Sequence, residues 1–151
     1  MNSALEFHDS ECLAIEFDSV GNVVVTLDAY VHRTEGEPGQ SPGDGGMQRV
    51  RISIASTARL GEIGTLPASI YDGSLLTTSN SCPALVPLPF QSAESCELKL
   101  ELFDNDARTI QITGNNFSVT PEGEFRFVEH FNFSAESFGD EYHLSRMVRG
   151  K

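Results

Sequence analysis

Lysine is almost missing from this chain of 151 residues, since only Lys99 and Lys151 occur. Lysine and arginine together number 10, against 22 aspartates and glutamates, so the formal net charge is −12 at pH 7. Binding to nucleic acid depends on Lys and Arg side chains that neutralise phosphates. The composition therefore argues against nucleic-acid binding and against attachment to an anionic membrane surface. The same acidity favours solubility, and it would attract a basic protein partner.

Cysteine, tyrosine and tryptophan are also scarce or absent. The three cysteines, Cys12, Cys82 and Cys96, form no Cys-x-x-Cys pair, so the sequence offers neither a disulfide framework nor a zinc knuckle. We predict free thiols, with Cys82 the most exposed of the three. Tryptophan is absent and only three tyrosines occur, which weighs against an aromatic platform for sugars. No cofactor is expected.

Long apolar runs are missing as well. No segment approaches the roughly 20 apolar residues that a membrane-spanning helix needs. The first residues, Met-Asn-Ser-Ala-Leu-Glu-Phe-His-Asp, are neither basic nor apolar enough for a signal peptide. We therefore expect a cytoplasmic protein with no membrane association.

What the sequence does contain is alternation of apolar and polar residues, most clearly between Cys12 and Val31. Leu13, Ile15 and Phe17 recur at every second position, and so do the apolar residues from Val23 to Val31. A period of two places each set on one face of a β-strand. Ser19 to Asn22 supplies turn residues between the two runs. The pattern predicts a β-hairpin around which the rest of the chain is arranged.

Further alternating runs follow along the chain, separated by turn signals. Val50, Ile52 and Ile54 alternate in one run, and Cys96 to Phe103 in another. Residues 33–46 hold five glycines and two prolines, so we expect a long irregular loop there. The remaining expected elements are strands at residues 109–113, 117–119 and 125–129, an extended segment at residues 82–90, and tight turns at Asp9-Ser10, Asp72-Gly73, Asp104-Asn105-Asp106 and Gly114-Asn115-Asn116.

These elements predict an all-β fold, an antiparallel β-sandwich or barrel of about eight to ten short strands. Residues 1–131 are expected to form a single domain. The alternation is lost in residues 132–151, where we expect a partly disordered tail with one short helical turn at Ser134.

Several segments, taken in order, resemble a family. These are Phe7-His8-Asp9-Ser10, Leu66-Pro67 with Asp72-Gly73-x-Leu75, Val86-Pro87-Leu88-Pro89, Ile112-x-Gly114 and Phe127-Val128-Glu129-x-Phe131. Together they resemble small uncharacterised bacterial all-β proteins with an N-terminal His-Asp-Ser motif. The resemblance covers residues 5–131 and implies a β-sandwich without an assigned activity. Some small acidic proteins of this kind look like immunity proteins of bacterial toxin systems.

Candidates for catalysis are His8, Asp9 and Ser10. A histidine beside an acid and a serine invites a triad interpretation, but neighbours on a strand point to opposite faces and no Gly-x-Ser-x-Gly motif exposes a serine. The four histidines are scattered without metal-ligand spacing, so no metal site is predicted. A hydrolase or metal-dependent enzyme using His8 and Asp9 with a distant histidine is the alternative to a binding function.

The favoured function is that of an acidic, non-enzymatic protein-binding module, immunity-like toward a basic partner. A further alternative is small-ligand or carbohydrate binding on a sheet face. The acids expected to meet the basic partner lie on and after the alternating run that begins at Cys96; they are Glu97, Glu101, Asp104 and Asp106.

Overall fold

A computed structural model describes residues 1–79, 81–82 and 85–132, and every regular element among them is a β-strand. None of the described residues forms a helix, so none provides a helix able to cross a bilayer. The strands are β1 (Asn2–Phe17), β2 (Val23–Thr34), β3 (Gly43–Leu60), β4 (Ala68–Thr77), β5 (Ser81–Cys82), β6 (Leu85–Leu88), β7 (Phe90–Ser92), β8 (Cys96–Phe103), β9 (Ala107–Pro121) and β10 (Arg126–Phe131).

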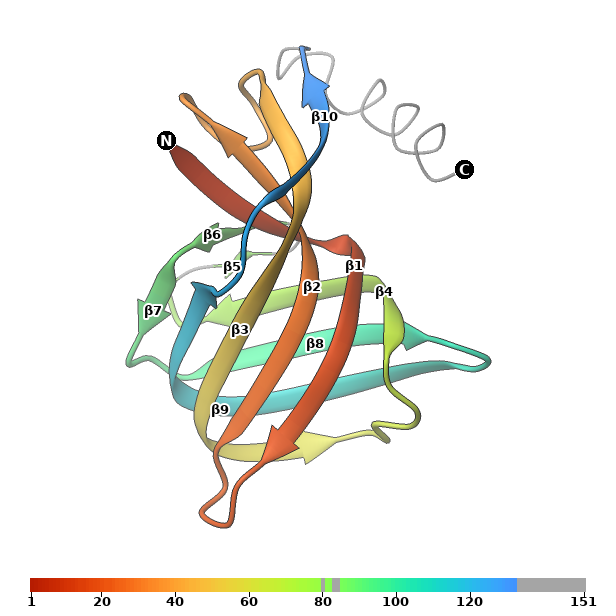
Figure 1. Cartoon of the computed structure of the whole chain (residues 1–151). Helices are drawn as coiled ribbons and strands as arrows, with labels where there is room; N and C mark the ends of the chain where they lie inside the picture. Colours follow the sequence, from red (N-terminus) through yellow and green to blue (C-terminus); the bar gives the residue numbers. More distant parts are fainter. Residues whose placement is uncertain (80, 83–84, 133–151) are drawn as a thin grey trace.

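The strands close into a six-stranded antiparallel barrel with the order β1-β2-β3-β9-β8-β4. In Figure 1, β1, β2 and β3 cross in front of β4, β8 and β9. The pair β3–β9 joins the two halves on one side. On the other side β1 and β4 meet in only two residue pairs, Glu11–Ser69 and Cys12–Ala68. The barrel alternative of the predicted fold class is therefore the one that the chain adopts.

Three predicted turns prove to be wrong, because the chain bends inside a strand where the sequence suggested a reversal. Asp9 has φ of 71° within β1, and the β1–β2 register breaks between Glu6 and Glu11. Asn116 has φ of 48° within β9. Such bulges add a residue to one strand and sharpen its bend. They let long strands of 16, 18 and 15 residues (β1, β3 and β9) follow the curved barrel wall.

The third wrong turn, Asp72-Gly73, lies in the middle of β4, where Gly73 is needed for packing. A Cβ atom built on Gly73 would lie 2.7 Å from Cγ of Phe7. The Phe7 ring, which is 1% exposed, thus fills the space left where β1 turns away from β4. A small residue is required by close approach here, and the sequence alone does not distinguish that from a turn.

The part of β1 before the bulge extends beyond the barrel as its upper end, toward the N-terminus in Figure 1. There β1 pairs with β2 on one side and with β6 on the other. Strand β10 pairs with the first residues of β3, from Gly43 to Met47. The proline-rich segment contributes the short strands β5, β6 and β7, which confirms its predicted extended conformation.

The expected irregular loop at residues 33–46 is shorter than predicted, because its first two residues end β2 and its last four begin β3. A Cβ atom on Gly45 would lie 2.0 Å from Oη of Tyr30 and 2.9 Å from a ring carbon of Phe131. The glycines let these rings lie directly against the backbone of the strand. At Gly45 the lack of a side chain serves packing, whereas Gly39 in the remaining loop adopts a positive φ of 83°.

The predicted inward faces are largely confirmed. Val23, Val25 and Leu27 on β2 are at most 1% exposed, and the core also takes the apolar positions of β3, β8 and β9. The face predicted for Leu13, Ile15 and Phe17 is confirmed in part: Ile15 pairs with the buried Val25 and packs against the core, whereas Phe17, at the end of β1, is 39% exposed. A second register shift between Cys12 and Ala14 changes which side chains point inward.

The three cysteines lie inside the protein, whereas the last strand leaves a large side chain exposed. All three thiols are free and buried, and Cys82, at 9% exposed, is the most exposed of the three, as predicted. Burial raises the pKa of Cys12 to about 12 and also raises the pKa of Cys82 and Cys96. The expected last strand does not form a hairpin with the strand before it, since β10 pairs with β3, and Phe127 on β10 is 54% exposed and does not join the core. The helical turn expected at Ser134 lies outside the described residues.

Candidate functional site

His8 and Asp9 lie on the bulge of β1, and the bend alters the geometry assumed for a regular strand. The left-handed conformation of Asp9 brings its Oδ1 to 3.5 Å from Nε2 of His8. The other ring nitrogen of His8, Nδ1, lies 2.7 Å from the carbonyl oxygen of Tyr71 on β4. The expectation that these neighbours point to opposite faces is therefore wrong at this position. The histidine is held between β1 and β4, with about half of its side chain exposed.

Ser10, the third member of the His-Asp-Ser segment, points into the protein. Its hydroxyl donates a hydrogen bond to the carbonyl of Glu6 over 2.6 Å and accepts one from the backbone N–H of Tyr30 over 2.9 Å. Ser10 is 4% exposed. These bonds satisfy backbone groups that the bulge removes from the β1–β2 ladder. The geometry gives the serine a structural role and leaves its hydroxyl inaccessible to a substrate.

A cleft of about 350 Å³ opens beside this bulge, between β1, β4 and the end of β8. It contains the exposed side of His8 together with two exposed aromatic rings, Tyr71 and Phe103. Its lining is His8, Asp9, Ser10, Glu11, Ser69, Ile70, Tyr71 and Phe103.

The four acids predicted to bind a partner divide into two groups. Glu97 and Glu101 alternate with the buried leucines of β8 and therefore point outward. The amide of Gln111 on β9 donates a hydrogen bond to Oε1 of Glu97 over 3.3 Å. These two carboxylates belong to the outer surface of the β4–β8–β9 wall.

Asp104 and Asp106 instead lie in the turn between β8 and β9. Oδ1 of Asp104 accepts hydrogen bonds from the backbone of Asn105 and Asp106, and it lies 2.8 Å from the guanidinium of Arg108. The bond from Asn105, with those from Asp106 and Arg108, lowers the pKa of Asp104. Arg108 also donates to the carbonyl of Thr65 over 2.6 Å. Asp104 therefore stabilises the turn and the loop before β4, whereas Asp106 stays exposed.

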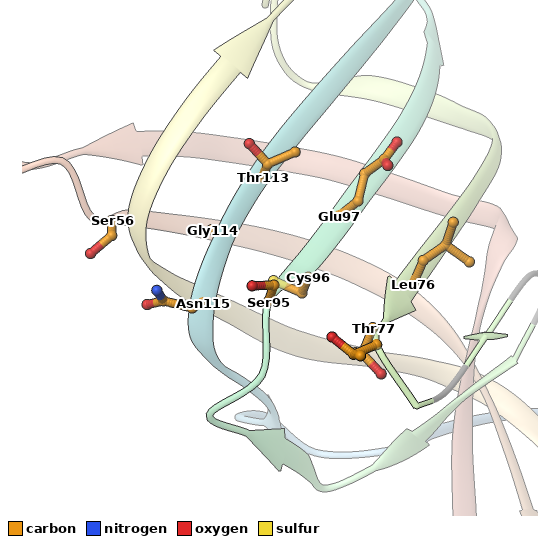
Figure 2. Close-up of a pocket in the computed structure, with 10 residues that line it drawn as sticks. Ser56, Leu76, Thr77, Ser95, Cys96, Glu97, Thr113, Gly114 and Asn115 are labelled. Carbon is orange, nitrogen blue, oxygen red and sulfur yellow. The ribbon is translucent and has the colours of Figure 1, made fainter.

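A second hollow, of about 550 Å³, lies at the other end of the same wall. Figure 2 shows its small polar lining, contributed by residues of β3, β4, β8 and β9, with Glu97 at one side. Cys96 lines it, but its thiol is buried and its pKa is raised by that burial. The hollow is shallow and half of its lining residues are Ser or Thr, so it adds a polar margin to the surface around Glu97.

A buried polar pair that the sequence pattern does not reveal lies at the upper end of the barrel. Nε2 of His32 lies 2.7 Å from Oε1 of Glu6, and both side chains are about 5% exposed or less. The His32 ring stacks on Phe131 of β10 with 4.9 Å between ring centroids. The hydroxyl of Tyr30 donates a hydrogen bond to Glu129 of β10. These contacts join β1, β2 and β10.

Alternation could not reveal this pair, because Glu6 lies between Leu5 and Phe7, and His32 follows Val31. A period of two would place both polar side chains on the solvent face. They are buried because both faces of β1 are covered here, from Ala4 to Phe7.

No group of three or more His, Cys, Asp or Glu side chains suited to a metal ion occurs among the residues that the structure describes. Comparison with known proteins adds no relative: no family model, no curated protein and no solved structure matches the chain.

Proposed function

We propose that this protein is a non-enzymatic binding module that recognises a basic protein through the outer surface of the β4–β8–β9 wall, in the manner of an immunity protein. The observation that carries the proposal is the combination of outward acids and exposed apolar side chains on one surface. Glu97 and Glu101 point outward from β8, and Asp72 lies opposite Glu101 on β4. Lys99 is the one basic residue of β8.

Exposed apolar side chains accompany these acids. Leu76 is the partner of Glu97 in the β4–β8 ladder, and Leu60 pairs with Gln111 at the edge next to β9. Leu60 is 69% exposed and Phe103 is 51% exposed. Large apolar side chains gathered on a surface, with polar residues around them, are typical of protein interaction sites. Their combination with carboxylates supports a partner that presents both apolar and basic groups.

The excess of acidic over basic residues in the whole sequence strengthens the electrostatic argument. A chain of net charge −12 carries few positive groups that would repel a cationic partner, so encounter is accelerated by long-range attraction. This attraction is screened by salt over about 8 Å at physiological ionic strength. Complex formation should therefore weaken as salt is raised.

The test uses three baits in lysate of cells that naturally contain the protein, at low and at high salt. They are the wild-type chain, Glu97→Lys/Glu101→Lys and the control Glu16→Lys/Glu124→Lys. Both variants change the net charge equally, and the control residues are exposed elsewhere on the surface. We expect a basic protein that is retained by wild type and control at low salt and is lost from the β8 variant. Equal retention by all three baits would contradict the proposal.

A further inference from the structure

The cleft beside the β1 bulge has a floor and two walls that follow directly from the strand register. Ser69 on β4 is paired with Glu11 on β1 and with Phe103 on β8. Paired residues point to the same face, and neighbouring strands lie about 4.8 Å apart. Ser69 is small, so the longer side chains of Glu11 and Phe103 rise on either side of it, about 10 Å apart. The row forms a groove across three strands.

Aromatic rings border this groove. Tyr71 is 67% exposed and is presented by a register shift between Ile70 and Asp72. The His8 ring meets the Tyr71 ring edge-on, with 6.5 Å between centroids, and Nδ1 of His8 lies 2.7 Å from the backbone carbonyl oxygen of Tyr71. Two large aromatic side chains, Tyr71 and Phe103, therefore stand in solvent on rigid strands around one cleft.

The charge of the cleft is negative. Its lining includes the carboxylates of Asp9 and Glu11 and contains no lysine or arginine. The Glu11 carboxylate makes no hydrogen bond or ion pair with the residues that the structure describes. A rigid set of aromatic faces beside a carboxylate matches a planar cation, which can stack on a ring and donate paired hydrogen bonds to the acid.

We propose that this cleft receives an arginine side chain of the basic partner, with the guanidinium against Tyr71 or Phe103 and hydrogen-bonded to Glu11. The inference rests on the proposed function and specifies how the same surface selects its partner. Arginine fits better than lysine, because guanidinium is planar, weakly hydrated and stacks on aromatic faces, whereas ammonium is a compact and strongly hydrated charge. The cleft volume of about 350 Å³ is at the lower end of the range for ligand pockets, which suits a single side chain.

The experiment titrates the full-length chain with two peptides followed by NMR at low salt. Both are acetylated and amidated and carry four cationic residues alternating with glycine, one with arginine and the other with lysine. We expect the arginine peptide to bind about two- to fivefold more tightly. Its largest resonance shifts should fall on Tyr71, Phe103 and Ser69.

Variants at the cleft separate stacking from general charge attraction. Tyr71→Ala and Phe103→Ala should remove the preference for arginine and leave the affinity for the lysine peptide nearly unchanged. Phe103→Tyr, which keeps an aromatic ring, should retain the preference for arginine. The matched control is Phe127→Ala, which removes an equally exposed ring on β10. Glu11→Gln should weaken binding of the arginine peptide more than that of the lysine peptide.

The outcomes distinguish this inference from the function on which it rests. Equal affinity for both peptides, with a loss in Glu97→Lys/Glu101→Lys and none in Tyr71→Ala, would overturn the arginine cleft and leave the acidic binding surface standing. Arginine preference that depends on Tyr71 but is indifferent to the β8 acids would support the cleft and contradict the role of β8. No resonance shift on this wall with either peptide would overturn both.

Discussion

At the lower end of the molecule, where β4, β8 and β9 complete the closed barrel, the interior is filled by aliphatic side chains. Leu98, Leu100 and Ile112 are examples, and all three are fully buried. The upper end, where β1 and β2 extend beyond the closed barrel, instead buries the carboxylate of Glu6 and the imidazole of His32 against Phe131. Both ends use the same strands β1 and β2. The two ends differ in the kind of side chain that the surrounding strands bury, aliphatic at one end and polar at the other.

The two ends of the barrel are specified by different kinds of interaction. Aliphatic burial has no direction, so the lower end requires only apolar residues of suitable volume at alternate positions. A buried carboxylate requires a partner at hydrogen-bond distance, since an unmatched polar group costs free energy in a dry interior. The upper end therefore depends on particular pairs of side chains, whereas the lower end depends on the apolar volume that it encloses.

The largest effect is expected at the lower end, for Leu100→Ala. The side chain is 0% exposed and is surrounded by the core, so its removal leaves a cavity and should lower the free energy of unfolding by about 2–5 kcal/mol. Urea denaturation measures this change. Its neighbour Lys99 points outward, and Lys99→Ala should change stability by less than about 0.5 kcal/mol. Similar losses in the two variants would show that the aliphatic interior does not determine stability at this end.

A smaller effect, with a different signature, is expected at the upper end. Glu6→Leu leaves His32 without this carboxylate partner and should cost about 1–3 kcal/mol. His32→Leu should have a similar cost. Because replacing both partners by apolar groups removes the need for the hydrogen bond, Glu6→Leu/His32→Leu should cost less than the sum of the single changes. Additive losses in this double-mutant cycle would indicate that the pair is not coupled.

The smallest effect is expected at the β1–β2 turn, outside both interiors. Backbone hydrogen bonds, first of all from Asn22, lower the pKa of Asp18 below its ordinary value of 3.8. A lowered pKa in the folded protein stabilises it above the unfolded pKa, and the contribution is lost as pH falls through the folded pKa. Asp18→Asn should therefore reduce stability slightly near pH 7. The difference from wild type should shrink in denaturation curves between about pH 5 and pH 2, and a constant difference would contradict the assignment.

Much of the fold could be predicted from the sequence, because period-two alternation marks the strands of the lower end directly. Val23 to Leu27, Val50 to Ile54 and Cys96 to Leu102 are buried where alternation places them. Errors occur at Asp9, Gly73 and Asn116, where turn-forming residues lie inside strands. Such residues are common both in turns and at bends within a strand. The local sequence therefore does not predict whether the chain reverses or continues along a curved wall.

The candidate site was less predictable for the same reason. Glu97 and Glu101 could be placed outward from alternation on β8, and His8 could be selected as a candidate. That His8 lies beside Tyr71, 63 residues later in the chain, follows from the pairing of β1 with β4. The burial of Glu6 and His32 follows from the way β10 lies against the upper end.

By itself the sequence determined the strand-forming segments, the aliphatic faces and the acidic charge, since each of these depends on residue type and local spacing. Only the tertiary structure decided that β3 pairs with β9 to close the barrel, that Phe7 occupies the space above Gly73, and that Glu11, Ser69 and Phe103 form one groove. The physical reason is that barrel closure and side-chain packing join residues far apart in the chain, and alternation contains no information about which strands become neighbours.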